Sequence, residues 1–343
     1  MNSTNVYYYF KEGIHSDEAR NLKPTYKIVK NTSFVSNELT NSQTIAKIPN
    51  YSFFFHVYLV VGNERAILGK NSDEIVLKND GAKLIYLKNY LKALSSPRLS
   101  ICTIINFYKT YLKSIQLLVN KQIVHNCIQF DALMVNADSN AAPIIANFAF
   151  SLNILKATSL DYIRPFFIQY DPEYIAWPIE LHILSFLLTN KLPSLSLTNI
   201  QRIIRDVAKF NTVLQTFGKT IVSDYEDGAL EYFSKYVNKS ANYIVADIFY
   251  HYDTWDNYAL SIVFLRILIG LHKTIGKQHK FIILFMKLLV GNIHFNPLKR
   301  LSIRDTTNKL EGIIDTIDIC EWKRLFAATT AVASACFATS GHV

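Results

Sequence analysis

A histidine and a cysteine two residues apart are the side chains of this sequence best placed for chemistry. His125 and Cys127 both lie in the segment from Val124 to Asp131, which brings an imidazole close to a thiol. A thiol becomes a nucleophile when a base activates it and a further residue orients that base. The sequence offers no such orienting residue. We therefore interpret Cys127 as an inert, half-buried thiol, with a redox or nucleophilic role as the alternative.

Residues that commonly bind metals are scattered along the chain. The four cysteines show no Cys-x-x-Cys spacing and no clustering with histidine, which a tetrahedral zinc site requires. They are Cys102, Cys127, Cys320 and Cys336. Four histidines of the C-terminal half also lack ligand spacing, and they are His251, His272, His279 and His294. We predict no metal site, and we expect reduced thiols in a cytosol-like compartment.

Composition limits the class of protein. Half of the 343 residues are hydrophobic and 18% are charged, which excludes a disordered chain and allows two domains or one large two-lobed domain. The net charge of +9 favours acidic partners, but no run of basic residues concentrates it, so nucleic-acid binding is only an alternative. Residues 1–10 do not show the pattern of a secretory signal. The most apolar stretch, Tyr258 to Leu271, contains Arg266 and indicates a buried core helix rather than a membrane span.

Hydrophobic periodicity predicts strands early and helices late, which is an α+β arrangement. The first forty residues indicate short strands or loops, and aromatic alternation predicts a strand from Asn50 to Val61, with Phe53 to Tyr58 as sheet core rather than a base-stacking platform. Further strands are predicted over Glu74 to Leu77 and Leu84 to Leu87. A long helix from Leu99 to Asn120 precedes a short hairpin, Ala132 to Val135 and Pro143 to Phe150. The later helices are predicted over residues 178–189, 197–215, 228–237, 258–271, 281–290 and 303–315.

Five segments of the chain resemble the eukaryotic-type protein kinase family in that family's order. Residues 122–135, QIVHNCIQFDALMV, resemble the catalytic loop H-R-D-L-K-P-x-N, and residues 144–151, IIANFAFS, resemble the D-F-G segment. Residues 170–180, YDPEYIAWPIE, resemble the end of an activation segment with its A-P-E motif. Residues 256–262, DNYALSI, and residues 296–302, NPLKRLS, resemble D-x-Y-S-L-G-V and D-P-x-x-R-P-S. The resemblance covers about Phe34 to Ile317 and implies the two-lobed kinase fold.

The departures from the family remove its chemistry. Phosphoryl transfer needs carboxylates that hold magnesium and accept a proton. Under the resemblance, Cys127 stands at the catalytic Asp, Gln129 at the Lys and Ala132 at the metal-binding Asn, while Asn147 and Ala149 replace the D-F-G Asp and Gly. No glycine lies between Gly13 and Gly62, so no Gly-rich phosphate loop is present. The resemblance therefore implies an inactive pseudokinase with no catalytic residue, cofactor or metal.

The matches that remain are those that in the family hold the fold together. They are His125, Phe148, Pro178, Glu180, Asp256 and Arg300. Arg300 is expected to pair with Glu180. Glu38 is a candidate for the helix-C glutamate, with Lys27 or Lys30 as its partner and a solvated surface pair as the alternative. Asn147 and Gln129 form either a metal-free nucleotide grip or a satisfied polar cluster that fills the cleft.

The resemblance also implies a domain organisation. Residues 1–90 form a degenerate β-rich lobe, residues 91–325 form a helical lobe and residues 326–343 form a flexible small-residue tail, with a hinge over Leu87 to Leu94. An insertion of about residues 190–252 is a candidate partner surface. The composition, rich in Asn, Ile, Lys and Tyr, and the segment of residues 170–180 resemble kinase-like proteins of large DNA viruses. The expected function is a protein-binding scaffold in the cytoplasm of an infected cell or in the virion, whose partner is a virion protein or an active kinase. The alternative is a residual nucleotide-binding switch or atypical Ser/Thr kinase.

Overall fold

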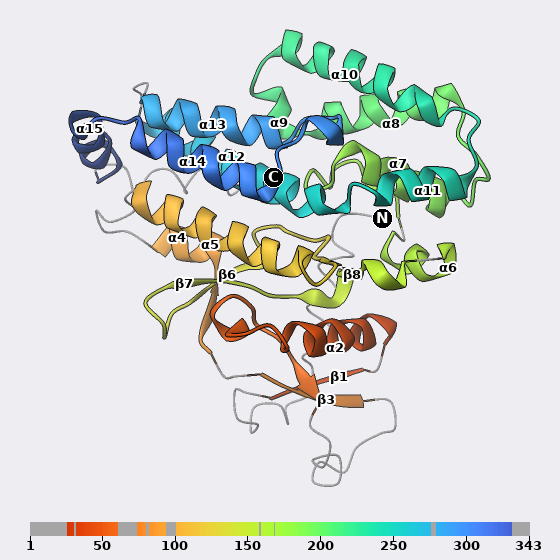
Figure 1. Cartoon of the computed structure of the whole chain (residues 1–343), viewed down its shortest axis with the longest axis horizontal. Coiled ribbons are helices and arrows are strands. Elements are labelled where there is room, and N and C mark those ends of the chain that lie inside the picture. The colour runs from red at the N-terminus through yellow and green to blue at the C-terminus, as the bar shows by residue number, and fades with distance from the viewer. Residues whose placement is uncertain are drawn as a thin grey trace.

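The computed structural model describes residues 26–30, 32–60, 74–79, 82–93, 101–157, 159–167, 169–275 and 279–330. Its class is mixed α+β with small sheets and mostly helices, as the periodicity predicts. A smaller part with strands and one helix lies below the larger helical part in Figure 1. Cys336, the Asp80-Gly81 turn and residues 331–343 of the expected tail lie outside the described residues.

The smaller part contains a three-stranded antiparallel sheet and a helix. Strands β1 (Tyr26–Lys30), β3 (Glu74–Lys78) and β2 (Leu59–Val60) lie in the order β1-β3-β2. Helix α2 (Ser33–Ile45) begins at Thr32, whose side chain accepts a hydrogen bond from the Val35 amide. The prediction of strands or loops throughout the first forty residues is therefore wrong from Ser33 onward. The periodicity is weak because the buried face of α2 includes polar residues, Asn41 and Ser42 among them.

The aromatic segment from Asn50 is not the long strand predicted. Asn50 has a left-handed backbone (φ 57°), and a short 3-10 helix, η2 (Tyr51–Phe53), follows it. Only Leu59–Val60 pairs as a strand with β3. Between them Phe55 forms an isolated bridge with Ile145 and is fully buried. The aromatic residues alternate as in a strand, but the backbone turns and brings Phe55 into the core of the larger part.

A second sheet and a two-stranded pair lie in the middle of the molecule. Strands β4 (Leu84–Tyr86), β6 (Leu133–Asn136) and β7 (Ala142–Ile145) pair antiparallel in the order β4-β6-β7, which confirms the predicted hairpin. Strand β5 (Ile123–Val124) pairs with β8 (Leu152–Asn153). The segment predicted as a hinge is helical, since α4 covers Leu87–Ala93.

Long helices form the larger part. They are α5 (Ile101–Val119), α7 (Ile179–Thr189), α12 (Trp255–Ile275), α13 (Lys280–Asn292), α14 (Ile303–Asp315) and α15 (Ile319–Thr330). The bounds of α14 are those predicted, whereas α15 continues five residues past the expected lobe boundary at Leu325. Shorter helical turns connect them, and they are η3 (Phe148–Phe150), η4 (Ile154–Lys156), α6 (Leu160–Ile163), η5 (Arg164–Phe166) and η8 (Pro297–Lys299).

The most apolar helix is central in this part. Residues Tyr252–Lys273 are long and apolar enough to cross a membrane by length and composition, so the stretch is longer than expected. Within the molecule, however, 78% of its most apolar window is buried. Its residues belong to one hydrophobic core that also contains α5, α7 and α13. This burial favours the predicted core helix.

The insertion is folded into helices that pack on this core. It contains α8 (Leu197–Phe210), α9 (Thr212–Gln215), α10 (Lys219–Phe233), η6 (Ser234–Tyr236), α11 (Ala241–Phe249) and η7 (Tyr252–Thr254). One predicted helix is two, because the Asn211 side chain accepts from the amides of Val213 and Leu214 and begins α9. Helix α10 begins nine residues before Gly228, and α11 was not predicted. Figure 1 shows α8 and α10 at one end of the molecule.

Candidate functional site

The first turn of α12 holds the loop that follows β5. The Asp256 carboxylate accepts hydrogen bonds from the backbone N–H groups of His125 (2.6 Å) and Asn126 (3.0 Å). Asp256 is 2% exposed. Burial raises the pKa of Asp256 to about 7, although the two amides act to lower it. The contact fixes the path of the loop without using its side chains.

The His125 ring joins this loop to the segment after β7. Its Nε2 lies 2.9 Å from the Ala146 carbonyl oxygen, and the ring packs edge-on against Phe148 at 5.1 Å between centroids. Burial lowers the pKa of His125 to about 4, so the imidazole is neutral near pH 7. Nε2 must therefore carry the proton that the carbonyl accepts. The lone pair of Nδ1 then accepts from the Cys127 amide at 3.3 Å.

His125 is not available as a base for the Cys127 thiol in this arrangement. Because the backbone engages the Nδ1 lone pair of His125, that nitrogen is not free to deprotonate the thiol. The Tyr174 hydroxyl lies 3.2 Å from the Cys127 sulfur. Burial raises the pKa of the Cys127 thiol to about 11, and the charges of Asp131 and Asp256 add to this, while the Tyr174 hydrogen bond opposes it. A protonated thiol supports the interpretation of Cys127 as inert.

Three other positions at which the family's functional residues are replaced, Gln129, Ala132 and Asn147, have contacts within the protein. Asn147 has a left-handed backbone (φ 68°), and its Nδ2 donates to the Asp131 carbonyl oxygen at 2.9 Å. Ala132 is buried, and its carbonyl accepts from the Ala146 amide at 3.0 Å. Burial raises the pKa of Tyr174 well above its ordinary value, and a hydrogen bond from the Gln129 side chain acts to lower it. The amides of Asn147 and Gln129 thus have partners within the protein, which favours the polar-cluster interpretation.

Asp131 is a residue of this site that the sequence reasoning missed. It is the only acid between Val124 and Asn136. Burial raises the pKa of Tyr86, and the Asp131 charge adds to that rise as it does for Cys127. A carboxylate therefore lies beside the loop, four residues after the position of the expected catalytic acid. The signal available in the sequence was this isolated acid next to Ala132.

Helix α2 is fastened to the segment after β7 by two asparagines. Asn37 Nδ2 donates to the carbonyl oxygens of Ala149 and Ser151, both at 2.9 Å, and Asn41 Nδ2 donates to Ser151 at 3.0 Å. Glu38, between them, is 7% exposed, so the solvated surface pair considered for it is wrong. The side chains of Lys27 and Lys30 lie outside the described residues. No sequence motif indicated the asparagine contacts.

Glu180 and Arg300 form a buried ion pair, as the resemblance implies. Arg300 Nη2 donates to Glu180 Oε2 at 2.9 Å, and each side chain is 1% exposed. The guanidinium also donates to the His294 carbonyl at 2.8 Å and to the Thr254 hydroxyl at 3.1 Å. Burial alone would lower the pKa of Arg300, but Glu180 raises it above its ordinary value. Pro178 caps the N-terminus of α7 and places Glu180 in its first turn.

The insertion covers this ion pair. Tyr225 of α10 is buried and packs edge-on against Phe295 at 5.5 Å between centroids. One turn further, Gly228 lies so close to Phe295 that an added Cβ would be 2.5 Å from its Cζ. The inner face of α10 is therefore part of the core, and only the outer faces of the insertion remain for a partner.

Two of the four histidines of the C-terminal half have polar partners within the protein. His279 Nδ1 lies 3.3 Å from a Glu321 carboxylate oxygen, and His294 Nδ1 accepts from the Asn296 amide at 3.0 Å. Within the described ranges, no group of three or more histidine, cysteine, aspartate or glutamate residues could hold a metal ion.

No family model and no curated protein matches this chain.

Proposed function

We propose that this protein is a kinase-like pseudokinase that binds other proteins as a scaffold and has no phosphoryl-transfer activity. The proposal rests on a contrast between two groups of residues, those that hold the fold together and those at the positions where the family has its catalytic groups. The side chains of Asp256, Glu180 and Arg300 hold distant segments together in buried contacts. By contrast, the side chains of Cys127 and Asn147 are engaged by protein groups and supply no carboxylate. Such a chain keeps a fold but lacks the groups that magnesium-dependent transfer needs.

Nucleotide binding tests the inactive state directly. We expect no change in melting temperature when millimolar ATP is added, either with magnesium or with EDTA, because a ligand raises the melting temperature only if it binds the folded state. A parallel assay with radiolabelled ATP and a generic protein substrate should show no transfer. A magnesium-dependent rise in melting temperature would contradict the proposal.

Asp131 is the observation that favours the alternative function, a residual nucleotide-binding switch. Its charge contributes to the raised pKa of Cys127, and carboxylate oxygens are ligands that Mg²⁺ prefers. If the switch operates, ATP with magnesium stabilises the wild-type protein, and Asp131→Asn abolishes that stabilisation. Asp171→Asn, a change of an acid two residues before Glu173 in another loop, is the matched control and should leave it unchanged.

Substitutions on the outer face of the insertion test the scaffold role. Tyr250 is 79% exposed and Tyr243 is 48% exposed, one on α11 and one immediately after it. We expect Tyr243→Ala with Tyr250→Ala to weaken capture of a partner from the producing cells without changing the melting temperature, because exposed aromatic residues are enriched among the residues that dominate interfaces. Tyr86→Ala, at an exposed tyrosine of the middle sheet, serves as the control. A partner set that is unchanged in the double variant would exclude this face.

A further inference from the structure

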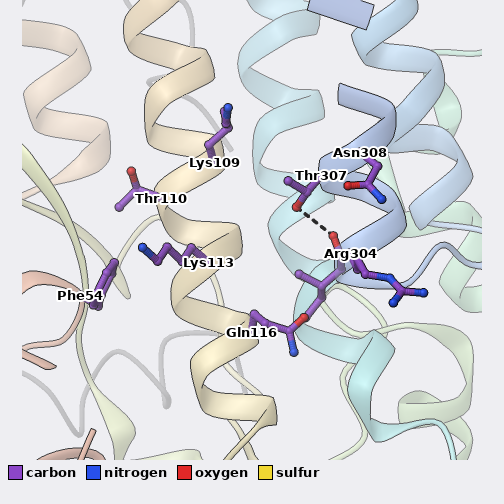
Figure 2. Close-up of a pocket in the computed structure, with 9 residues that line it drawn as sticks. Phe54, Lys109, Thr110, Lys113, Gln116, Arg304, Thr307 and Asn308 are labelled. Carbon is purple, nitrogen blue, oxygen red and sulfur yellow. Dashed lines mark hydrogen bonds between the residues drawn. The ribbon is translucent and has the colours of Figure 1, made fainter. Parts of the chain in front are cut away.

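A groove on the outer side of α5 is separate from the candidate site. It has a volume of about 720 Å³ and lies along α5 and α14, with Phe54 at one edge. Figure 2 shows Lys109, Thr110, Lys113 and Gln116 on α5, and Arg304, Thr307 and Asn308 on α14. On each helix the lining residues lie within one strip, since adjacent residues are joined by others three or four positions further along. Buried Ile303 contributes to the groove and gives it an apolar portion.

Two cations flank the groove. Lys113 is exposed and directed toward Phe54, with its Nζ 5.1 Å from the ring centroid. Arg304 is exposed on the α14 side and makes no ion pair with an acid of the described ranges. A third cation, Lys109, contacts Glu311 at 3.0 Å in an exposed pair of the kind that contributes little to stability. Among the residues that the structure describes, no acid forms an ion pair with Lys113 or Arg304, so the groove carries positive charge at these two positions.

The threonines of the groove present acceptors rather than donors. The Thr110 hydroxyl donates to the Asn106 carbonyl at 2.9 Å, and the Thr307 hydroxyl donates to the Ile303 carbonyl at 3.0 Å. Since each hydroxyl proton is used within its own helix, the oxygen lone pairs remain for a ligand. Peptide N–H groups can donate to such oxygens, whereas phosphate oxygens cannot. Nucleic-acid bases also carry N–H donors, so these oxygens alone do not separate the two classes of ligand. Nucleic acids draw their affinity from many phosphate contacts, whereas this groove offers two cations without an acidic partner among the described residues, which favours a short acidic peptide.

We infer that this groove binds an acidic segment of a partner protein, with carboxylates at Lys113 and Arg304 and apolar side chains against Phe54 and Ile303. The inference rests on the proposed scaffold function only in that the occupant is a protein. The net charge of +9 attracts acidic partners in general. The positions of Lys113 and Arg304 in the groove determine where the carboxylates of such a partner bind. The inference does not depend on the contacts around Cys127.

The probe is a fluorescein-labelled decapeptide of alternating glutamate and leucine, and fluorescence anisotropy measures its binding to the full chain. Lys113→Glu with Arg304→Glu should weaken binding on the order of tenfold or more, which corresponds to about 1.4 kcal/mol. The control, Lys191→Glu with Lys219→Glu, reverses two exposed lysines of the insertion and gives the same net charge. It should bind as the wild type does, and both variants should keep the wild-type melting temperature.

Three results would overturn the inference. They are absence of peptide binding to the wild type, an equal loss in the control pair, and displacement of the peptide by an oligothymidylate that binds more tightly. The second would mean attraction by net charge alone, and the third would assign the groove to nucleic acid. A decapeptide of alternating lysine and leucine should not bind. Because the readout is peptide binding, failure here leaves the nucleotide tests of the proposed function unaffected.

Discussion

At the scale of single residues, Glu180 and Arg300 make the contact with the largest expected effect on stability. Removal of one partner leaves a buried charge unpaired, so Glu180→Ala should lower the free energy of unfolding by about 3–5 kcal/mol. Urea unfolding measures this value. The double variant Glu180→Leu with Arg300→Met removes both charges and should recover much of the loss. If the single variant is as stable as the wild type, the pair does not hold α7 to the loop before α14.

His182 makes the stability depend on pH. Burial lowers the pKa of His182 from 6.5 to about 3, while the carbonyls of Trp177 and Tyr174 act in the opposite direction. The unfolded chain therefore binds a proton between about pH 6.5 and pH 3 that the folded chain does not bind. The contribution of His182 is complete above about pH 6.5 and is lost progressively as the pH falls through this window.

The test for His182 compares two pH values. His182→Phe, which keeps an aromatic ring beside Tyr170 and Trp177, should reduce the loss of stability between about pH 7.5 and about pH 5 by ~2 kcal/mol. The comparison is made within each protein, so a different baseline in the variant does not matter. Asp256 acts with the opposite sign, because its raised pKa adds stability as the pH falls below about 7. Equal losses in the wild type and the variant would exclude a neutral buried His182.

At the scale of elements, two helix glycines have different surroundings, and their substitution by alanine should have opposite effects on stability. Gly228→Ala should destabilise the protein by about 1–3 kcal/mol, since a Cβ cannot fit against the Phe295 ring, which Tyr225 also contacts. Gly312→Ala on α14 has open space around its Cβ and should stabilise it by roughly 0.5–1 kcal/mol. Thermal unfolding of both variants checks this. A stabilised Gly228→Ala variant would mean that α10 is not seated on Phe295.

The sequence predicts the long apolar helices and the central hairpin well, because their burial follows a simple period. It does not predict α2, whose buried side chains Asn41 and Ser42 are polar and find partners far along the chain. The prediction for Asn50 to Val61 is wrong for the opposite reason. Its local alternation is strong, but the backbone turns and Phe55 packs into the main core, with its ring 6.0 Å from that of Phe148. In the site, the motif residues were predictable one by one. The engagement of Cys127 by Tyr174 depends on a tertiary contact that spacing cannot show, whereas Asp131 was visible in the sequence as an isolated acid.

At the scale of the whole molecule, the described buried apolar residues form two separate clusters. One continuous cluster joins Phe55 and Leu87 to the helices of the larger part, whereas Leu39 and Leu77 form a small separate cluster under the β1-β3-β2 sheet. Parts of a protein that do not share a continuous core can open as separate cooperative units with different free energies. Amides of β3 should therefore exchange with deuterium faster than those of α5 and α12. Hydrogen exchange with mass spectrometry measures this, and equal protection in all three would show that the two clusters unfold as one.

The acceptor role of Asp256 has a consequence for how this sequence changes with time. The carboxylate binds peptide N–H groups, which every residue except proline supplies at positions 125 and 126. Substitutions in the loop can accumulate without loss of that contact, whereas Asp256 itself has no equivalent. We therefore expect distant relatives to keep this aspartate even where the amino acids of the loop differ at most positions. We expect the same of the Glu180 and Arg300 pair. A search for such relatives gains most from weighting these three positions.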